Sequence, residues 1–89
     1  MTGMLYYMQL AEANGRMIFM NLTKAIEGKE YIIKDIVTED EEMDAFLFSL
    51  GCFAGESITV VTRRRGGCTV AIKDARYSID NNLCEAILI

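Results

Sequence analysis

The hydrophobic and polar positions change their spacing along the chain, and each spacing predicts an element. Residues 31–37 are a run of β-branched and aromatic side chains behind the glycine at position 28, which predicts a strand. The next apolar positions are three and four residues apart, as on one face of an α-helix. These positions are Met43, Phe46, Leu47 and Leu50. The chain therefore passes from a strand into a helix of about three turns.

Both ends of this helix are marked in the sequence. Thr38 and Glu41 match a capping box, in which the threonine oxygen accepts a backbone hydrogen bond and the glutamate reaches back to the cap. Acidic side chains gather in the first turns, where the helix dipole favours negative charge. Gly51 follows the last apolar position, as expected for a left-handed C-terminal cap.

Strand signals resume after a turn at Ala54-Gly55-Glu56 and continue to residue 89. A tight reversal is expected at Arg65-Gly66-Gly67, because paired glycines supply the positive φ that hairpin turns need. A second turn is expected at 74–75, and Asp80 is the expected cap of a single helical turn over 81–85. The expected strands cover residues 57–64, 69–73, 76–79 and 86–89.

Several short strands and one helix predict a mainly β fold. We expect a small, partly open SH3-like β-barrel with one short α-helix and a one-turn helix near the C-terminus. Such a barrel leaves few exposed edges, which protects the apolar final strand. An oligonucleotide-binding-type barrel is the structural alternative.

The N-terminal residues differ in composition from the rest of the chain. Residues 1–19 are rich in methionine and low in charge, so we interpret them as an extension that precedes a single domain over residues 20–89. The alternative interpretation is that residues 5–13 form a short helix that docks on the barrel or on a second copy.

Composition narrows the classes of function. Nine Lys and Arg against thirteen Asp and Glu give a net charge of −4, which argues against a dedicated nucleic-acid-binding protein. No apolar run approaches the ~20 residues that cross a bilayer, and no signal-peptide pattern is seen. Three cysteines without paired spacing favour a reducing compartment. We therefore expect a cytoplasmic protein without membrane insertion.

Catalytic and metal chemistry find little support in the sequence. The chain has no histidine, P-loop, nucleophile elbow or dinucleotide fingerprint, so we expect neither enzyme activity nor a cofactor. Cys52, Cys68 and Cys84 lack a Cys-x-x-Cys pair, and we interpret them as small buried hydrophobes instead of metal ligands. The alternative is a small transition-metal-binding protein that uses the three thiolates.

Two groups of side chains are candidates for contact with a partner. Arg63, Arg64 and Arg65 form a basic cluster at the predicted hairpin and suit an acidic surface, although alternation sends Arg64 to the opposite face. Solvated loop positions are the alternative interpretation. The aromatic candidates are Phe48, Phe53 and Tyr77. Phe48 lies off the apolar stripe of the helix, so it either packs on a strand or is exposed as a contact.

The order of these elements resembles the FeoA family of small cytoplasmic proteins in bacterial ferrous iron transport. The family pattern L-x-x-L-G-x-x-x-G-x-x-I-x-V is matched by residues 47–60. Ala54 departs from the family, which often has proline there, as does the Arg65–Cys68 stretch, where many members have Gly-Asp-Pro. Together with Tyr-Ile-Ile at 31–33 and the apolar final strand, the resemblance covers about residues 21–89.

This resemblance implies an accessory or regulatory protein that binds FeoB, a membrane ferrous iron permease with a cytoplasmic GTP-binding domain. FeoA-like modules also occur as C-terminal domains of iron-dependent repressors, and such an interaction domain is the alternative function. Weak self-association is left open. In a protein tied to iron transport, the absent histidine favours a chain that assists transport without chelating the metal strongly.

Overall fold

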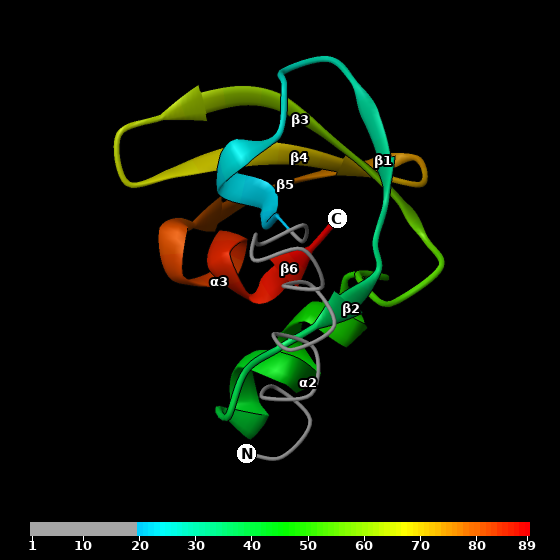
Figure 1. The fold of residues 1–89 in the computed structure, drawn as a ribbon, viewed down its shortest axis with the longest axis vertical. Helices are drawn as coiled ribbons and strands as arrows, with labels where there is room; N and C mark the ends of the chain where they lie inside the picture. The colour runs from blue at the N-terminus through cyan, green and yellow to red at the C-terminus, as the bar shows by residue number, and fades with distance from the viewer. Residues whose placement is uncertain (1–19) are drawn as a thin grey trace, which may run out of the picture.

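The computed structural model describes residues 20–89 and confirms the mainly β class (Figure 1). Strands β1, β3, β4 and β5 form one antiparallel sheet in the order β1-β3-β4-β5, and β2 pairs with β6 in a second sheet. The two sheets do not close on each other, as in a partly open barrel. In chain order the elements are η1 (Leu22–Lys24), β1 (Glu30–Ile32), β2 (Asp35–Ile36), α2 (Glu41–Ser49), β3 (Ser57–Arg64), β4 (Gly67–Ile72), β5 (Ala75–Asp80), α3 (Asn81–Ala86) and β6 (Ile87–Leu88).

The prediction of one strand over residues 31–37 was wrong, because the chain changes sheets within that run. β1 pairs with β3, whereas β2 pairs with β6. At the crossing, the buried Ile33 donates its N–H to Glu56 O at 2.8 Å and accepts from Gly55 N at 2.9 Å. The N–H of Lys34 then donates to a carbonyl of β6 at 2.7 Å. Both halves carry strand-forming side chains, so their composition does not reveal the change of partner.

The core lies between the two sheets and the helices. Its fully buried side chains come from nearly every element, and within residues 20–89 no polar or charged residue joins them. The largest are Leu22, Ile33, Leu47, Ile58, Val60, Val70, Ile72 and Ile87, and the three cysteines lie among them. Each cysteine is therefore a small buried hydrophobe, as the sequence predicted.

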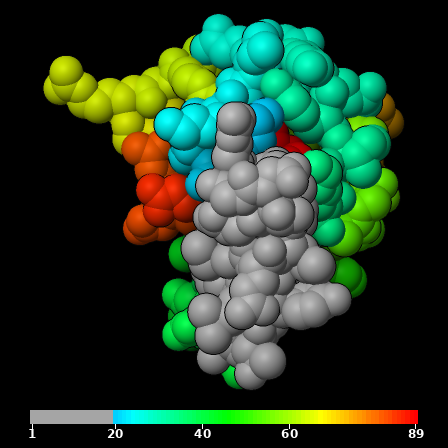
Figure 2. Space-filling model, viewed as in Figure 1, coloured from blue at the N-terminus to red at the C-terminus, as the bar shows by residue number. Residues whose placement is uncertain are grey.

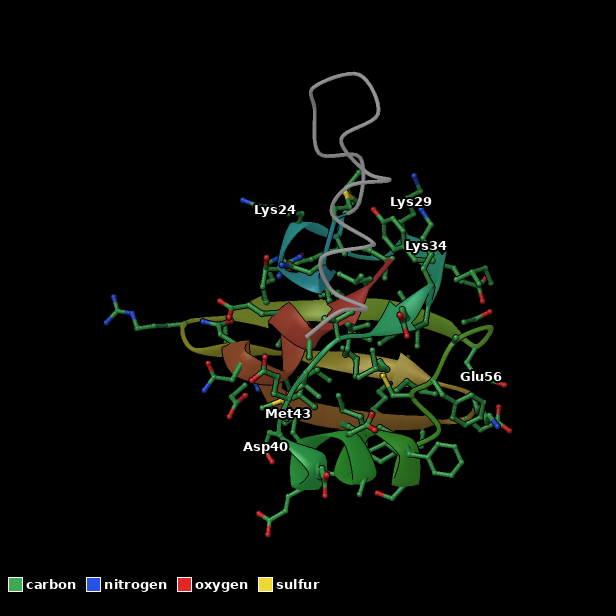
Figure 3. The ribbon with its side chains drawn as sticks, turned by 60° about the horizontal axis from the view of Figure 1, so that its bottom comes forward. Lys24, Lys29, Lys34, Asp40, Met43 and Glu56 are labelled. Carbon is green, nitrogen blue, oxygen red and sulfur yellow. The ribbon has the colours of Figure 1, made fainter. Side chains whose placement is uncertain are left out.

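The N-terminal cap of α2 is Asp40, and the predicted capping box at Thr38 was wrong. The Asp40 carboxylate accepts the N–H groups of Glu42 and Met43 at 3.0 and 3.2 Å. Thr38 Oγ1 accepts the N–H of Asp40 at 3.0 Å, which orients the cap from outside the helix. Asp40 lies at the start of α2 in Figure 3. The carboxylate also carries the negative charge that the helix dipole favours at this end.

The C-terminal end of α2 confirms the predicted glycine cap. Gly51 has φ +89°, which glycine adopts without a Cβ clash. Its N–H donates to Phe48 O at 3.0 Å, and the N–H of Cys52 donates to Leu47 O at 2.9 Å. These two bonds form a Schellman motif, which turns the chain back toward the helix it has just left.

The two glycines of the β3–β4 hairpin have different roles, which corrects the prediction that both supply positive φ. Gly66 alone has positive φ, at +86°. Gly67 begins β4, where an added Cβ would lie 2.1 Å from Ile79 O on the neighbouring strand. The next turn falls at Lys73-Asp74, one residue earlier than expected, with Lys73 at φ +57°. The Asp80 cap of α3 is confirmed by its bond from Leu83 N at 2.9 Å.

None of the helices in residues 20–89 has the length and apolar character that crossing a membrane requires. Residues 1–19, with the extension and the short helix considered for it, lie outside the described residues.

Candidate functional site

The six side chains proposed from the sequence do not form one surface. Phe48 and Phe53 lie beside the start of β3, and the arginines lie at its end. Eight extended residues separate these ends by roughly 23 Å. Figure 1 shows the β3–β4 hairpin on the side of the molecule opposite the loop that leads into β3. A small partner can therefore contact one group without reaching the other.

The aromatic group forms an exposed patch at the end of α2. The rings of Phe48 and Phe53 are stacked at a tilt, with centroids 5.1 Å apart. Lys73 Nζ lies 5.5 Å from the Phe53 centroid and 3.8 Å from Glu56 Oε2. Phe48 keeps 66% of its surface exposed although it is one of the largest apolar side chains. We call Phe48, Phe53, Glu56 and Lys73 the aromatic patch.

The local sequence explains how these residues meet. The Schellman turn at Gly51 reverses the chain, so Phe53 returns to the last turn of α2 and packs on Phe48. Gly51 lies against the β4–β5 turn, where an added Cβ would be 3.6 Å from side-chain atoms of Ile72 and Lys73. The positive φ of Lys73 then turns the β4–β5 hairpin beside Phe53. Sequence spacing identified the two phenylalanines but gave no signal for Lys73.

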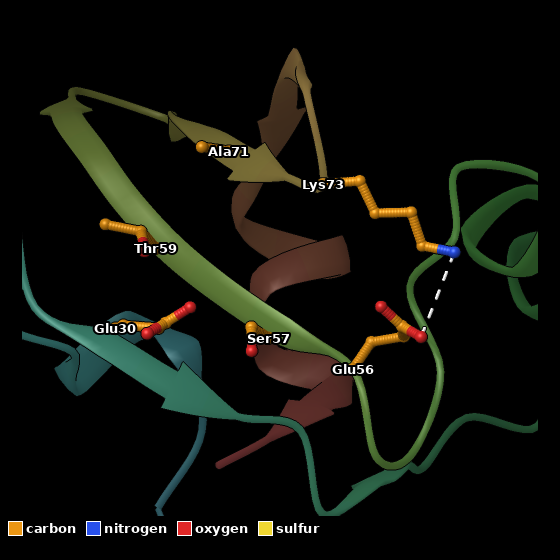
Figure 4. Close-up of a pocket in the computed structure, with 6 residues that line it drawn as sticks. All are labelled: Glu30, Glu56, Ser57, Thr59, Ala71 and Lys73. Atoms are coloured by element: carbon orange, nitrogen blue, oxygen red, sulfur yellow. Dashed lines mark ion pairs between the residues drawn. The ribbon is translucent and has the colours of Figure 1, made fainter.

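A polar depression adjoins the aromatic patch through Glu56 and Lys73 (Figure 4). Its volume is about 330 Å³, and the outer faces of β1, β3 and β4 form it. In Figure 4 Lys73 reaches across one side toward Glu56, and Glu30 lies on another side. The lining residues are Glu30, Glu56, Ser57, Thr59, Ala71 and Lys73. Small side chains thus leave space for a partner's polar side chains next to the aromatic rings.

The Arg63 side chain bonds to the protein backbone and does not extend into solvent. Its Nη2 donates to Leu22 O at 3.0 Å and also to Ala25 O, while its backbone N–H donates to Glu27 Oε2 at 2.7 Å. A register irregularity between Val60 and Thr62 precedes it in β3. One guanidinium therefore satisfies two carbonyls of the η1 segment and ties that segment to β3.

Arg64 and Arg65 point away from this interior contact. Arg64 Nη1 donates to Thr69 Oγ1 at 2.6 Å, and its Nη2 donates to Ser78 Oγ. Arg65 is exposed in the hairpin turn, which projects from the body of the molecule in Figure 2. The opposite directions of Arg63 and Arg64 agree with the predicted alternation.

A groove of about 360 Å³ lies beside the hairpin. It is lined by Phe46, Arg64, Arg65, Gly66, Gly67, Ser78, Ile79, Asp80 and Leu83. Phe46 belongs to the predicted apolar stripe of α2, yet it is 47% exposed. Within that stripe Leu47 is fully buried, whereas Met43 and Leu50 pack partly against the core. Tyr77 is the remaining predicted contact residue, and it is partly buried against the core.

The cysteines have the chemistry of core residues. Burial raises the pKa of Cys52 to about 12, and burial together with a hydrogen bond to Cys68 raises the pKa of Cys84 to about 12. The Cys68 and Cys84 sulfurs lie 3.3 Å apart, and all three thiols are free. Within residues 20–89 no group of three or more His, Cys, Asp or Glu side chains is placed to hold a metal ion. The structure therefore does not support the three-thiolate alternative.

Comparisons with known proteins bear on both fold and family. The sequence profile of the FeoA domain matches residues 20–89. No curated protein matches the sequence. Among solved structures, an iron uptake regulatory protein, FeoA, superposes with a TM-score of 0.71 at 20% identity, covering 79% of this chain and 93% of that one. Zinc-complexed FeoA of Stenotrophomonas maltophilia, described as an SH3 domain protein, gives 0.68 at 14%, covering 76% and 86%.

A second kind of similar structure is a part of a longer protein. A manganese-dependent transcriptional repressor superposes with a TM-score of 0.74 at 23% identity. The match covers 86% of this chain but 45% of the repressor. Together these structures confirm the predicted SH3-like class.

Proposed function

Because the chain belongs to the FeoA family, we propose that it is a small cytoplasmic accessory protein of bacterial ferrous iron transport that binds the cytoplasmic part of a FeoB-type permease. The family domain covers residues 20–89, which is the whole described fold. The iron transport setting follows from the family. The permease as direct partner, the cytoplasmic location and the contact surface are our proposal.

The observation that carries the contact surface is the exposed aromatic patch. Phe48 presents its ring to solvent at the end of a capped helix and is stacked on the half-buried Phe53, beside a cation at Lys73. Burying a phenylalanine side chain is worth about 1.5–3 kcal/mol, and aromatic anchors commonly dominate interfaces. The polar depression next to the patch would supply hydrogen-bonding groups at its rim. We therefore assign partner binding to the aromatic patch first.

The hairpin arginines are a second contact region in this proposal. Arg65 is exposed at the turn, and Arg64 lines the groove with Phe46. An acidic partner surface suits both side chains. Arg63 is excluded because its guanidinium is bound to Leu22 O and Ala25 O, and Tyr77 because it packs on the core.

A binding role without catalysis is part of the proposal. Burial raises the pKa values of Cys52 and Cys84, and both thiols lie in the core. Burial there favours the neutral thiol, which is neither nucleophile nor metal ligand.

An interaction domain of the repressor type is the second candidate function. It is favoured by the likeness to the manganese-dependent repressor, of which this chain spans less than half. Such a domain would act through contacts with a DNA-binding partner instead of a permease. Binding to the permease domain distinguishes the two candidates.

A pull-down with the immobilised cytoplasmic domain of the permease, with and without guanine nucleotide, tests the proposal. We expect capture of the native chain and loss of capture for Phe48→Ala. Ile26→Ala is the matched control, since it removes another large exposed apolar side chain that belongs to neither contact region. Arg65→Glu tests the second contact region. Failure of the native chain to bind in either nucleotide state would refute the permease as direct partner.

A further inference from the structure

The free edge of β5 is a surface that the proposed function does not use. β5 is the last strand of the four-stranded sheet and pairs along one side with β4. The N–H of Asn81 donates to Gly66 O at 3.0 Å, which fixes the phase of the antiparallel ladder. Because narrow and wide pairs alternate, the N–H and C=O groups of Arg76, Ser78 and Asp80 point away from β4. The Asp80 carbonyl accepts the first backbone bond of α3, because Asp80 is the N-cap of that helix. Within residues 20–89 no backbone bond from a turn or loop reaches the other outward groups.

These outward backbone groups reach solvent. The side chains of Arg76, Ser78 and Asp80 are all exposed. A buried backbone group without a partner is rare because its desolvation is costly, so the unpaired groups of this edge must be hydrated. A hydrated strand edge is a template for another strand, unless its side chains prevent pairing.

The side chains of β5 are complementary to themselves in the antiparallel direction. When two copies of Ala-Arg-Tyr-Ser-Ile-Asp run antiparallel with Ser78 opposite Ser78, Arg76 faces Asp80 of the second copy. On the other face, Tyr77 then lies opposite Ile79 of the second copy. Opposite charges and aromatic–β-branched pairs across strands are both stabilising. The same two charges would instead discourage a parallel pairing, which sets like side chains side by side.

The phase of the hydrogen bonds selects the same register. The three outward residues meet one another, with Ser78 at the centre and Arg76 and Asp80 exchanged. The Ser78 pair can form two hydrogen bonds, and each Arg76–Asp80 pair can form one, from Asp80 N–H to Arg76 O. A shift by two residues leaves one outward residue of each copy unpaired and separates the charges. Within residues 20–89 Arg76 has no ion-pair partner, and Asp80 uses one carboxylate oxygen to cap α3, so both charges are available.

We propose that two copies of this protein associate through their β5 edges, antiparallel about a two-fold axis at Ser78. The association joins two four-stranded sheets into one continuous sheet. It does not depend on permease binding, because neither the aromatic patch nor the two hairpin arginines of the second contact region belong to β5. The contact is short, so the dimer is expected to be weak and dependent on concentration.

Sedimentation velocity of the full reduced chain over a wide concentration range tests this proposal. We expect the mass to rise from 10.0 kDa toward twice that value. Arg76→Glu sets like charges opposite Asp80 at both ends of the pairing and should weaken the dimer about tenfold, by about 1.4 kcal/mol in total. Lys24→Glu makes the same charge change on η1 and should leave the dimer intact.

A second variant addresses the backbone contact. Ser78→Pro removes an N–H that points away from β4, and proline is tolerated on the open side of an edge strand. This variant should abolish the dimer, and circular dichroism checks that it remains folded. If Ser78→Pro unfolds the protein, the effect of Arg76→Glu on the dimer is the test of the proposal. A chain that stays monomeric at all concentrations would overturn the proposal. So would a dimer that Arg76→Glu leaves as tight as the native one.

Discussion

At the residue scale, the adjacent glycines of the β3–β4 hairpin are required for different physical reasons. Gly66 needs its positive φ, whereas Gly67 needs the absence of a side chain, because Ile79 O occupies the space of a Cβ at 2.1 Å. The backbone carbonyl cannot rotate away as a flexible side chain would. Replacing each glycine with alanine therefore distinguishes the two physical requirements.

We predict that Gly67→Ala destabilises the protein by about 3 kcal/mol, since the added methyl forces β4 and β5 apart. Gly66→Ala is the matched control, with open space around its Cβ, and should cost about 1–2 kcal/mol from backbone conformation alone. Urea unfolding of both variants measures the two free energies. A larger loss for Gly66→Ala would contradict the close approach at Gly67.

The buried thiols predict a loss of stability at high pH. Burial raises the pKa of Cys52 from 9.0 to about 12, so the folded chain holds this proton where the unfolded chain has lost it. The contribution of Cys52 is complete below pH 9 and falls by about 1.4 kcal/mol per pH unit from pH 9 to 12. Native protein should therefore lose roughly 2 kcal/mol more than Cys52→Ala between pH 8 and 10.5.

Urea unfolding under reducing conditions at the two pH values measures this difference. Every other titratable group is common to both proteins, so its contribution cancels in the difference. Equal losses for Cys52→Ala and the native chain would mean that the thiol ionises without penalty in the folded state.

At the scale of elements, Arg63 joins two segments that sequence alone does not connect. Its guanidinium bonds to the carbonyls of Leu22 and Ala25, which lie 41 and 38 residues earlier in the chain. The sequence suggested a basic surface cluster because Arg63 is the first of three consecutive arginines. Their separate roles depend on strand register and on where η1 packs, which no local pattern encodes.

We predict that Arg63→Ala lowers the free energy of unfolding by about 2–3 kcal/mol, because two carbonyls lose a charged donor. Arg63→Lys should not restore it, since one ammonium cannot reproduce the planar fork of the guanidinium. Arg65→Ala is the control and should stay within about 0.5 kcal/mol, being exposed in the turn. Thermal or urea unfolding measures these free energies. Similar losses of stability for Arg63→Ala and Arg65→Ala would contradict the structural role of Arg63.

The elements that the sequence predicted well are those with local signals. The strand over 57–64, the Gly51 cap and the Asp80 cap depend on neighbours within a few residues, and the structure confirms all three. The run 31–37 was predicted poorly because its break reflects a change of partner strand. The cap of α2 was misplaced because Thr38 and Asp40 are both good caps, and only the path of the chain selects the aspartate.

At the scale of the whole molecule, the fold sets apart the two groups of contact residues that were proposed from the sequence. β3 sets the aromatic patch and the hairpin arginines at opposite ends of the domain. Phe48 could be proposed from the sequence because it falls outside the apolar stripe of α2, and Phe53 because it is an aromatic residue in a loop of a predicted barrel. Lys73 and Glu56 could not, because their approach requires the β4–β5 turn to meet the Schellman turn of α2.

The two surfaces give the molecule separate sites for two kinds of partner. The aromatic patch serves the permease in our proposal, and the β5 edge serves a second copy. Because they share no residue, a dimer would present two aromatic patches to a partner. The proposed binding to the permease then depends most on whether the aromatic patch is the contact.

An NMR titration of the ¹⁵N-labelled chain with the unlabelled cytoplasmic domain of the permease tests this claim most directly. We predict amide shifts concentrated at residues 48–56 and at Lys73, with binding weakened at least tenfold by Phe48→Ala and unchanged by Ile26→Ala. Absence of binding, or shifts confined to the β3–β4 hairpin or β5, would contradict the assignment of the aromatic patch.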